Sequence, residues 1–447
     1  MKLYSTHSFN NTSSNTSSNT NNTSITIITI IITIIIVMML PQALLKPLLT
    51  VTAATLGSLT FTALIDCQPS LFVWDRWHRI LHRSDGNNRN DDADGPPRVI
   101  RDFYEGKNVW IIGASSGIGE EMALQLSRAG CANLILSARH ETRLQRVAQQ
   151  CRKAAAAAAA EAEATASATA TSPTTNERSF QCYCQPLDIV STEGSEELEA
   201  RFEHVLRNQL PPSAVPIDIV VFNAGAGQLQ PSLETPARTI QRIMDVNALW
   251  PMILTPLLFK HNIFRSQRHH HHHHHHHHRA IPHIVVTNSI AAQLPVPLSA
   301  VYAASKAAQA RYFASLVAEQ PPGSIRVDVL CPGPIDTDFH RNHADDATTT
   351  VSDESGTAAT KDRDATSPRT KMAVDRCVRL MVSAAARRGS NGKGGYREVW
   401  IAPPPLVPVL FFQRHFPDPF QRLATRFGQR RVQLWREGKD LYDPKSW

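Results

Sequence analysis

The strongest constraint on the fold is a glycine-rich stretch at residues 108–121. It reads NVWIIGASSGIGEE, in which an apolar run ends at Gly113, and Gly117 and Gly119 precede a helical pattern that closes at Gly130. This order is typical of a buried strand, a tight turn and a helix. Glycine is needed because a Cβ atom would block the turn and the approach of a pyrophosphate to the helix N-terminus. The stretch predicts a dinucleotide-binding unit; an ordinary tight turn is the alternative.

Length and charge narrow the class of protein. The 447 residues exceed one large domain of about 250 residues, and the surplus lies in segments of biased composition. The formal net charge is +7, with basic residues near an apolar N-terminal segment and in the C-terminal tail. This placement favours a membrane surface over nucleic acid, for which the chain carries no motif.

Cysteine and histidine usage predicts neither disulfides nor a metal site. Seven cysteines without regular spacing argue against a disulfide framework. Cys182 and Cys184 could form half a metal site, but no second pair exists, so they more simply alternate along a strand. The ten histidines at residues 269–278 could bind divalent ions, but we interpret them as a repeat expansion in an exposed loop.

The N-terminal region predicts a membrane anchor. Residues 1–24 form a low-complexity tail rich in Ser, Thr and Asn. Residues 25–66 are the predicted anchor, since two apolar runs approach the ~20 residues that span a bilayer. Either both runs insert as a hairpin, or the second run alone is the anchor of a chain that starts at Met38 or Met39. Residues 67–105 are predicted to be an interfacial or packed amphipathic helix and a polar linker.

The sequence predicts an α/β fold with an N-terminal membrane anchor and a C-terminal extension. Residues 106–402 are predicted to form the fold itself, a Rossmann-like doubly wound parallel sheet. Strands are expected at residues 109–112, 133–139, 180–186, 217–222, 283–289, 325–331 and 397–401. Helices are expected at residues 122–129, 141–153, 193–209, 239–258 and 371–386.

Three low-complexity inserts interrupt this pattern, at residues 154–175, 269–278 and 341–370. The first two fall in helix-to-strand loops, which lie at the sheet edge away from bound ligands. The third leaves the ligand edge, where a substrate lid would lie. The extension at residues 403–447 is apolar and then basic, and predicts a lid or a membrane contact; packing against the core is the alternative.

The end of the second predicted strand bears on the choice of cofactor. Arg139 lies 20 residues beyond Gly119, where dinucleotide folds place the residue that reads the ribose. An acidic residue there would favour NAD(H), whereas a guanidinium suits a 2′-phosphate. The sequence therefore predicts NADP(H) over NAD(H); the alternative is a solvated arginine that opens the following helix.

A serine, a tyrosine and a lysine suggest proton transfer at a carbonyl or alcohol. Tyr302 and Lys306 are four residues apart and share a helix face. The pKa of a free tyrosine is ~10, and a neighbouring cation is expected to lower it. Ser289 closes the fifth strand, and we expect its hydroxyl to bind the oxygen on which charge develops.

Residues 101–442 resemble the membrane-anchored dehydrogenase/reductase branch of the short-chain dehydrogenase/reductase family, which includes reductases of retinoid and steroid carbonyls. The resemblance rests on the glycine turn, the LSAR sequence that ends at Arg139, and KMAVDRCVRLM (371–381) before EVWI (398–401). It implies a catalytic set of Asn247, Ser289, Tyr302 and Lys306, with Asn247 holding a water that links Lys306 to solvent. It also implies cofactor contacts at Gly113, Ser115, Ser116, Gly117, Ile118, Gly119, Arg139, Asp188, Asn223, Ala224, Gly225, Tyr302, Lys306, Pro332, Gly333 and Thr337.

Three residues depart from the family pattern. Ile112 replaces the threonine that opens the turn motif, Phe222 stands where many members have asparagine, and Ala292 replaces a glycine near the catalytic serine. None of these changes removes a reacting group. The resemblance therefore implies the reaction class but leaves the substrate open.

The sequence as a whole predicts a membrane-bound oxidoreductase that transfers hydride between NADP(H) and a lipophilic carbonyl or alcohol, retinoid-like or steroid-like. Reduction of a 3-keto sphingoid base is one alternative, and a non-catalytic NADP-binding scaffold of the same fold is another. The expected partners are the small-molecule substrate and membrane lipid, without nucleic acid, and a homodimer is left open. The expected location is the endoplasmic reticulum membrane, with a plastid or other organelle membrane as the alternative.

Overall fold

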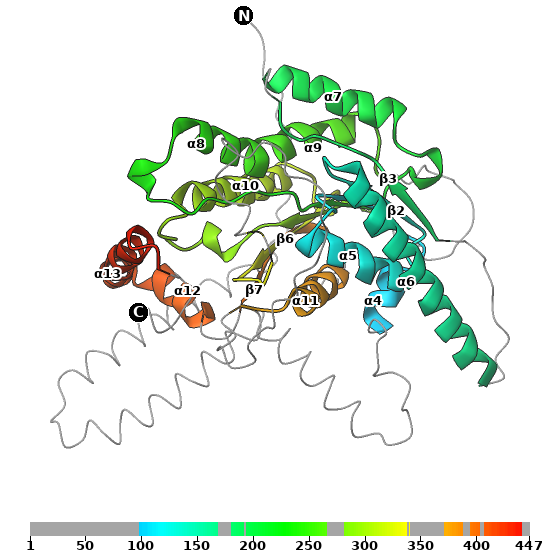
Figure 1. Ribbon diagram of the computed structural model, residues 1–447. Coiled ribbons are helices and arrows are strands. Elements are labelled where there is room, and N and C mark those ends of the chain that lie inside the picture. The colour runs from blue at the N-terminus through cyan, green and yellow to red at the C-terminus, as the bar shows by residue number, and fades with distance from the viewer. Residues whose placement is uncertain are drawn as a thin grey trace, which may run out of the picture. The chain divides into compact units, whose positions relative to one another are not determined.

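The computed structural model describes residues 98–168, 180–191, 194–265, 281–337, 339, 371–387, 394–402 and 406–439 (Figure 1). The predicted tail, anchor and interfacial segment before residue 98, the histidine tract and the insert at 341–370 lie outside these residues. Among the residues described, no helix combines the length and the apolar character needed to cross a bilayer.

Seven parallel strands form the centre of the fold and confirm the predicted Rossmann-like sheet. The strands are β1 (Asn108–Ile112), β2 (Asn133–Ser137), β3 (Gln181–Cys184), β4 (Ile219–Phe222), β5 (His283–Thr287), β6 (Arg326–Pro332) and β7 (Gly395–Ile401). Their spatial order is β3-β2-β1-β4-β5-β6-β7. The order reverses direction between β1 and β4, and ligands of such sheets bind beyond the carboxyl ends of the strands at this switch point.

Helices cover both faces of the sheet (Figure 1). One face carries α4 (Arg98–Tyr104), α5 (Gly117–Arg128), α6 (Glu141–Ala168) and α11 (Val374–Ala386), and the other carries α7 (Ser195–Asn208), α9 (Trp250–Lys260) and α10 (Ala300–Ala318). Strand side chains alternate between the two layers, so Ile111 joins the first core and Trp110 and Ile112 join the second. Both layers are apolar because a parallel sheet is buried on both faces.

Two helical segments differ from the sequence prediction. The helix expected at residues 141–153, with a partial extension into the alanine-rich stretch left open, continues to Ala168, because alanine has the highest helix propensity. The helix expected at residues 239–258 is divided into α8 (Ala237–Met244), a π-helical turn (Asp245–Leu249) and α9. Such π turns often mark functional sites, and this one carries Asn247.

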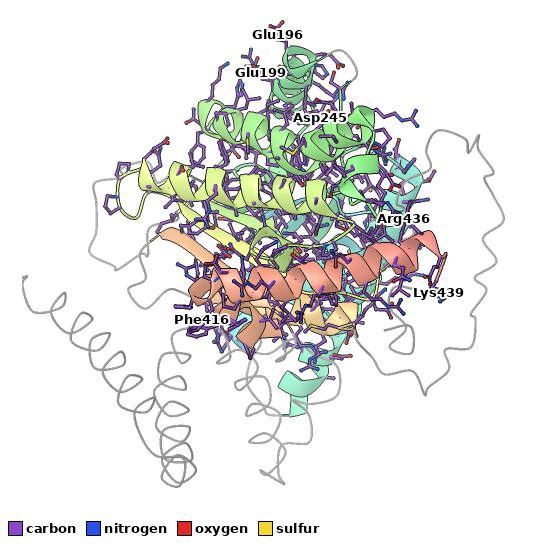
Figure 2. All side chains as sticks on the ribbon, turned by 90° about the vertical axis from the view of Figure 1, so that its left-hand side faces the viewer. Glu196, Glu199, Asp245, Phe416, Arg436 and Lys439 are labelled. Carbon is purple, nitrogen blue, oxygen red and sulfur yellow. The ribbon has the colours of Figure 1, made fainter. Side chains whose placement is uncertain are left out.

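The C-terminal extension packs over loops that follow β4 and β5. It forms α12 (Leu406–His415) and α13 (Pro417–Arg436), and Figure 2 shows α13 running from Phe416 to Arg436. Leu434 is fully buried against Leu298, and the Arg436 guanidinium lies 2.8 Å from a Glu234 carboxylate oxygen. The extension therefore lies at the carboxyl edge of the sheet.

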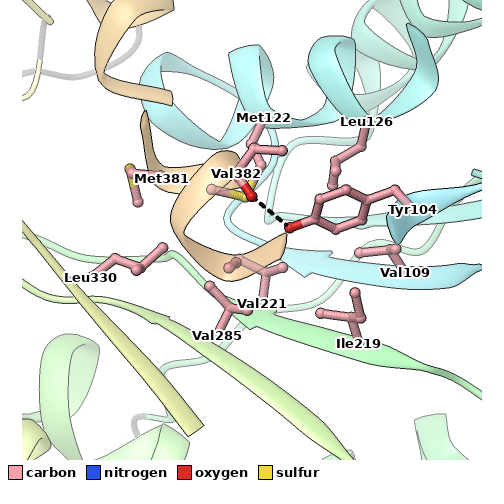
Figure 3. A pocket seen from close by; sticks show the side chains of 11 residues that line it. Tyr104, Val109, Met122, Leu126, Ile219, Val221, Val285, Leu330, Met381 and Val382 are labelled. Carbon is pink, nitrogen blue, oxygen red and sulfur yellow. Dashed lines mark hydrogen bonds between the residues drawn. The ribbon is translucent and has the colours of Figure 1, made fainter. Parts of the chain in front are cut away.

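A small apolar cavity lies between β1, β4, α5 and α11 (Figure 3). Tyr104 borders it and donates a hydrogen bond to the Val382 carbonyl oxygen at 3.3 Å. The other lining side chains are aliphatic or methionine, and none of the predicted site residues is among them. We interpret this space as a packing gap in the core.

Candidate active site

The glycine turn has the geometry that its sequence predicts. Gly113 has a φ of +96°, and a Cβ atom there would lie 2.4 Å from the main-chain nitrogen of Ala224. A Cβ atom on Gly119 would lie 2.0 Å from the carbonyl oxygen of Gly113. Ser116 precedes the first turn of α5 without a side-chain capping bond, so its hydroxyl leaves the N–H groups at the helix N-terminus open to an anion.

The Asn223-Ala224-Gly225 segment supports the turn from β4. The Asn223 side-chain amide donates to the Gly113 carbonyl oxygen at 2.8 Å. The main-chain nitrogens of Asn223 and Ala224 donate to the Ile112 carbonyl oxygen at 2.9 and 2.8 Å. These bonds connect the turn to β4 although Ile112 lacks the hydroxyl of the family threonine.

Phe222 fills a buried position at the end of β4. Its ring centroid lies 5.1 Å from that of Trp250 and 5.7 Å from that of Phe313. The departure from asparagine at this position is therefore accommodated by an aromatic cluster under the site.

The end of β6 reaches the glycine turn from the other side. Pro332 closes β6, and the Gly333 nitrogen donates to the Ile401 carbonyl oxygen at 2.8 Å. The Thr337 methyl carbon lies 3.5 Å from where a Gly117 Cβ atom would be. The structure thus brings Gly117 and Thr337 together from elements more than two hundred residues apart.

Arg139 and Asp188 lie after the ends of β2 and β3. Arg139 is exposed, and no ion pair joins it to another described residue. The Asp188 carboxylate accepts from the Val190 nitrogen at 3.1 Å. Arg139 is therefore available to an anionic group at the outer part of the cofactor edge.

Ser289, Tyr302 and Lys306 meet at the carboxyl end of β5. The Ser289 side chain lies beside the Tyr302 hydroxyl, whose pKa it lowers, and the Ser289 oxygen accepts from the Ala291 nitrogen at 3.1 Å. Lys306 Nζ donates to the Thr287 carbonyl oxygen at 2.8 Å. One helical turn of α10 therefore presents the phenol and the ammonium to the end of one strand.

Burial dominates the protonation of this site. It raises the pKa of Tyr302 to about 12, although the neighbouring Ser289 side chain lowers it in part. This direction is opposite to the lowering expected from a neighbouring cation, because burial disfavours the charged phenolate. Burial also lowers the pKa of Lys306 to about 8. At neutral pH, therefore, the phenol is protonated and the lysine is mostly an ammonium.

Asn247 connects the segment after β4 to α10. Its side-chain nitrogen donates to the Ala226 carbonyl oxygen and to Ser305 Oγ, both at 2.8 Å. Its side-chain oxygen accepts from the Ala226 nitrogen at 2.8 Å. The side chain of Asn247 is therefore held by the protein, and its oxygen borders the same space beside Gly225 as Lys306 Nζ.

Two buried amides in this network were not predicted from the sequence. Asn288 accepts from the Ser289 nitrogen at 2.8 Å and donates to the Lys306 carbonyl oxygen at 2.9 Å. Gln309 donates to the Asn247 carbonyl oxygen at 2.8 Å. The available signal was a single glutamine among apolar residues, one helical turn beyond Lys306.

Comparison with known proteins gives the family. The model of the family described as short chain dehydrogenase matches residues 107–192 and 158–348. The chain belongs to the short-chain dehydrogenase/reductase family of oxidoreductases. Human dehydrogenase/reductase SDR family member 7 is 30% identical over 335 residues, which cover 74% of this chain and 80% of the relative.

Further members of the short-chain dehydrogenase/reductase family are more distant. Dehydrogenase/reductase SDR family member 7B of Xenopus laevis is 26% identical over 240 residues, covering 54% of this chain and 62% of the relative. The solved structure of a short chain dehydrogenase from Burkholderia cenocepacia in complex with NADP is 19% identical, covers 72% of this chain and 98% of its own, and has a TM-score of 0.45. The named relatives confirm the resemblance to the dehydrogenase/reductase branch.

The described part of the chain holds no group of three His, Cys, Asp or Glu side chains that could bind a metal ion. Its six cysteines are free thiols. Cys182 and Cys184 lie on the same face of β3 and pack against one core, whereas Tyr183 between them packs on the other, as expected of a strand.

Proposed function

We propose that this short-chain dehydrogenase/reductase reduces a lipophilic ketone or aldehyde with NADPH, or catalyses the reverse oxidation of the alcohol. The observation that carries the proposal is the meeting of three side chains at the carboxyl end of β5, where the buried Tyr302 lies beside Ser289 and one helical turn before Lys306. These groups lie at the same sheet edge as the glycine turn. A site with this arrangement can donate a proton while hydride arrives from a bound dinucleotide.

Each side chain has a defined task in reduction. A bound NADPH would supply the hydride for the new C–H bond at the carbonyl carbon. Tyr302 donates its proton to the carbonyl oxygen, and Ser289 donates a hydrogen bond to the same oxygen as negative charge develops. The Lys306 ammonium stabilises the resulting tyrosinate until a solvent proton restores the phenol. A phenol with a raised pKa is protonated at neutral pH, which suits the reductive direction.

The described residues fit a dinucleotide phosphate. Side chains at Gly113 and Gly119 would collide with the backbone, so the turn keeps room for close approach of a pyrophosphate. The N–H groups at the start of α5 and the positive end of its dipole attract anions. An exposed Arg139 offers bidentate hydrogen bonds to a 2′-phosphate, which supports NADPH over NADH.

Exposed apolar and basic side chains on the C-terminal extension support the proposal of a lipophilic substrate and a membrane location. Phe411, Leu423 and Phe427 are 47%, 59% and 46% exposed. Arg422 and Arg426 occupy the same turns of α13, so apolar and basic side chains alternate as on helices that lie in a lipid interface. Because α13 also packs on the loops beside the site, a substrate dissolved in lipid would have a short path to Tyr302.

The substrate class is tested by NADPH oxidation. The full-length protein in detergent is assayed with retinal, steroid ketones and a 3-keto sphingoid base, with NADH in parallel. We expect turnover of one lipid carbonyl, with NADPH preferred. Turnover of the sphingoid base alone would select that alternative. No turnover of any substrate, with NADPH still bound, would replace the proposal by the non-catalytic scaffold.

A further inference from the structure

Gln309 lies between two of the predicted catalytic residues. It is on α10, one turn beyond Lys306, and its side chain is 1% exposed. Its Nε2 donates to the Asn247 carbonyl oxygen at 2.8 Å, and its Oε1 lies 3.5 Å from Lys306 Nζ. One amide group therefore spans the distance between the π-helical turn and the buried ammonium.

The surrounding groups fix the orientation of this amide. Oε1 also accepts from the Asn288 side-chain nitrogen at 3.0 Å. An amide nitrogen and an ammonium can only donate, and a carbonyl oxygen can only accept. Rotating the Gln309 amide by 180° would place its NH₂ group against the Asn288 side-chain NH₂ and the Lys306 ammonium. It would also place the Gln309 oxygen against the Asn247 carbonyl oxygen. Only the observed orientation satisfies all three neighbours.

Asn288 extends the network to the catalytic serine. The same nitrogen that donates to Gln309 also donates to the Lys306 carbonyl oxygen at 2.9 Å, and the Asn288 oxygen accepts from the Ser289 nitrogen at 2.8 Å. Gln309 and Asn288 together therefore hydrogen-bond to Asn247, Ser289 and Lys306, all through groups that take no part in bond making.

We propose that Gln309 is a positioning residue of the hydride-transfer site. Its Oε1 and the Thr287 carbonyl oxygen hold the Lys306 ammonium between them, and its Nε2 anchors the Gln309 amide to the Asn247 carbonyl oxygen. This inference rests on the proposed function for its catalytic consequence. The family resemblance assigns a water to Asn247; in this chain the amide of Gln309 also donates to the Asn247 main-chain carbonyl oxygen. A water can accept and release protons, whereas an amide keeps its N–H protons, so Gln309 fixes the lysine and does not relay protons.

The position of Gln309 bears on the charge of Lys306. Cys331 on β6 is the titratable group that acts on both the ammonium and Tyr302, which lies one turn earlier on α10. Behind Cys331, a Glu398 carboxylate oxygen on β7 lies 3.9 Å from the sulfur. Burial keeps both Tyr302 and Cys331 neutral near pH 7, because it raises their pKa. The ammonium is therefore stabilised by carbonyl oxygens, and Gln309 supplies one of them.

Two substitutions of similar size test this assignment in opposite directions. Gln309→Met removes the acceptor, so we expect the pKa of Lys306 to fall. Gln309→Glu keeps an acceptor and adds negative charge, so we expect that pKa to rise. Each shift should be about one pKa unit, the scale of a single lost or gained charged contact. A residue with a merely structural role would not move the pKa in opposite directions.

The readout is an NMR titration of the full-length protein in detergent, labelled with ¹³C at lysine Cε. The Lys306 signal is assigned by its loss in Lys306→Gln, and Gln145→Met on the exposed surface of α6 is the matched control. Two opposite shifts, with the control unchanged, support the proposal. Shifts in the same direction, or below 0.2 units in both variants, would overturn it. The titration needs no turnover, so an inactive wild-type enzyme would refute the proposed function without affecting this test.

A measurement on the unsubstituted protein covers the case in which a variant fails to fold. The side-chain N–H protons of Gln309 should exchange slowly with solvent, because one of them is held by the Asn247 carbonyl in a buried site. Exchange as fast as that of Gln145, which is on the surface, would contradict the assignment.

Discussion

The side-chain amide of Asn223 donates a hydrogen bond to the carbonyl oxygen of Gly113 at 2.8 Å. It joins the end of β4 to the turn that follows β1, at the point where the strand order reverses. The shape of the phosphate cradle therefore depends on a residue in the neighbouring strand connection, and so does its affinity for a dinucleotide.

Replacing Asn223 with leucine tests this dependence. Asn223→Leu leaves the Gly113 carbonyl without its partner, and we expect the free energy of unfolding to fall by about 1–3 kcal/mol. NADPH affinity should fall as well, because the turn loses its support. Chemical denaturation and NADPH fluorescence titration measure the two effects, with Asn208→Leu on the surface of α7 as the control. Unchanged NADPH affinity would show that the turn holds its shape without Asn223.

Arg139 should control the choice between the two nicotinamide cofactors. Arg139→Glu replaces a hydrogen-bond donor with a carboxylate, whose negative charge would repel the negative 2′-phosphate. We expect the ratio of NADPH to NADH affinity to fall at least tenfold, since a charge-assisted hydrogen bond contributes about 1.5–3 kcal/mol. Binding titrations with both cofactors measure the ratio, and Arg143→Glu on α6 is the control. An unchanged ratio would assign the 2′-phosphate to another residue.

The fold could be predicted well because its signals are local and repeated. Apolar runs of strand length alternate with helical patterns, and the glycine spacing at residues 113–119 marks the first crossover. The placement of Tyr302 and Lys306 on one helix was predictable because a helix fixes the face of residues four apart. These patterns depend on neighbours in the sequence, which is why the parallel sheet and its strands were predictable.

The parts that were missed depend on contacts between distant segments. Gln309 and Asn288 differ little from ordinary polar residues until α10 packs against β5. The composition around Asn247 predicts ordinary helix and carries no signal for the π-helical turn. The raised pKa of Tyr302 also follows from burial, which the spacing of a tyrosine and a lysine does not report.

A buried charge cluster at the opposite end of the strands makes stability depend on pH. His283 Nε2 lies 2.8 Å from an Asp328 carboxylate oxygen, and Arg326 and Arg397 contact the same carboxylate at 2.7 and 2.8 Å. Burial lowers the pKa of His283 to about 4, more than the bond with Asp328 raises it. The folded protein therefore keeps His283 neutral at pH values where the unfolded chain binds a proton.

We expect the free energy of unfolding to fall as the pH drops from about 6.5, the ordinary pKa of histidine, toward about 4. When a histidine has a lower pKa in the folded protein than in the unfolded chain, protons bind preferentially to the unfolded chain. Lowering the pH therefore reduces the free energy of unfolding. Denaturation curves of His283→Asn should show a shallower dependence over this window than the wild type. His204→Asn on the surface of α7 should leave the dependence unchanged; equal slopes in all three proteins would refute the role of His283.

The exposed apolar residues of α13 should matter only for substrate delivered in lipid. In the double variant Leu423→Ser and Phe427→Ser, we expect a several-fold higher KM for a carbonyl substrate carried in anionic vesicles. The kcat for a water-soluble carbonyl should be unchanged, because neither side chain belongs to the site. Thr425→Ser on the same helix is the control. An unchanged KM for the vesicle-borne substrate would exclude this surface from substrate delivery.

The most direct test of the proposed chemistry is the activity of Tyr302→Phe. Removing the phenolic hydroxyl removes the proton donor and leaves the glycine turn and Arg139 in place. For the carbonyl that the wild-type enzyme reduces, we expect kcat to fall by about 10²–10⁴-fold, with NADPH affinity within about twofold of the wild type. Retained turnover in Tyr302→Phe, with NADPH still bound, would contradict the assignment of this tyrosine as the proton donor.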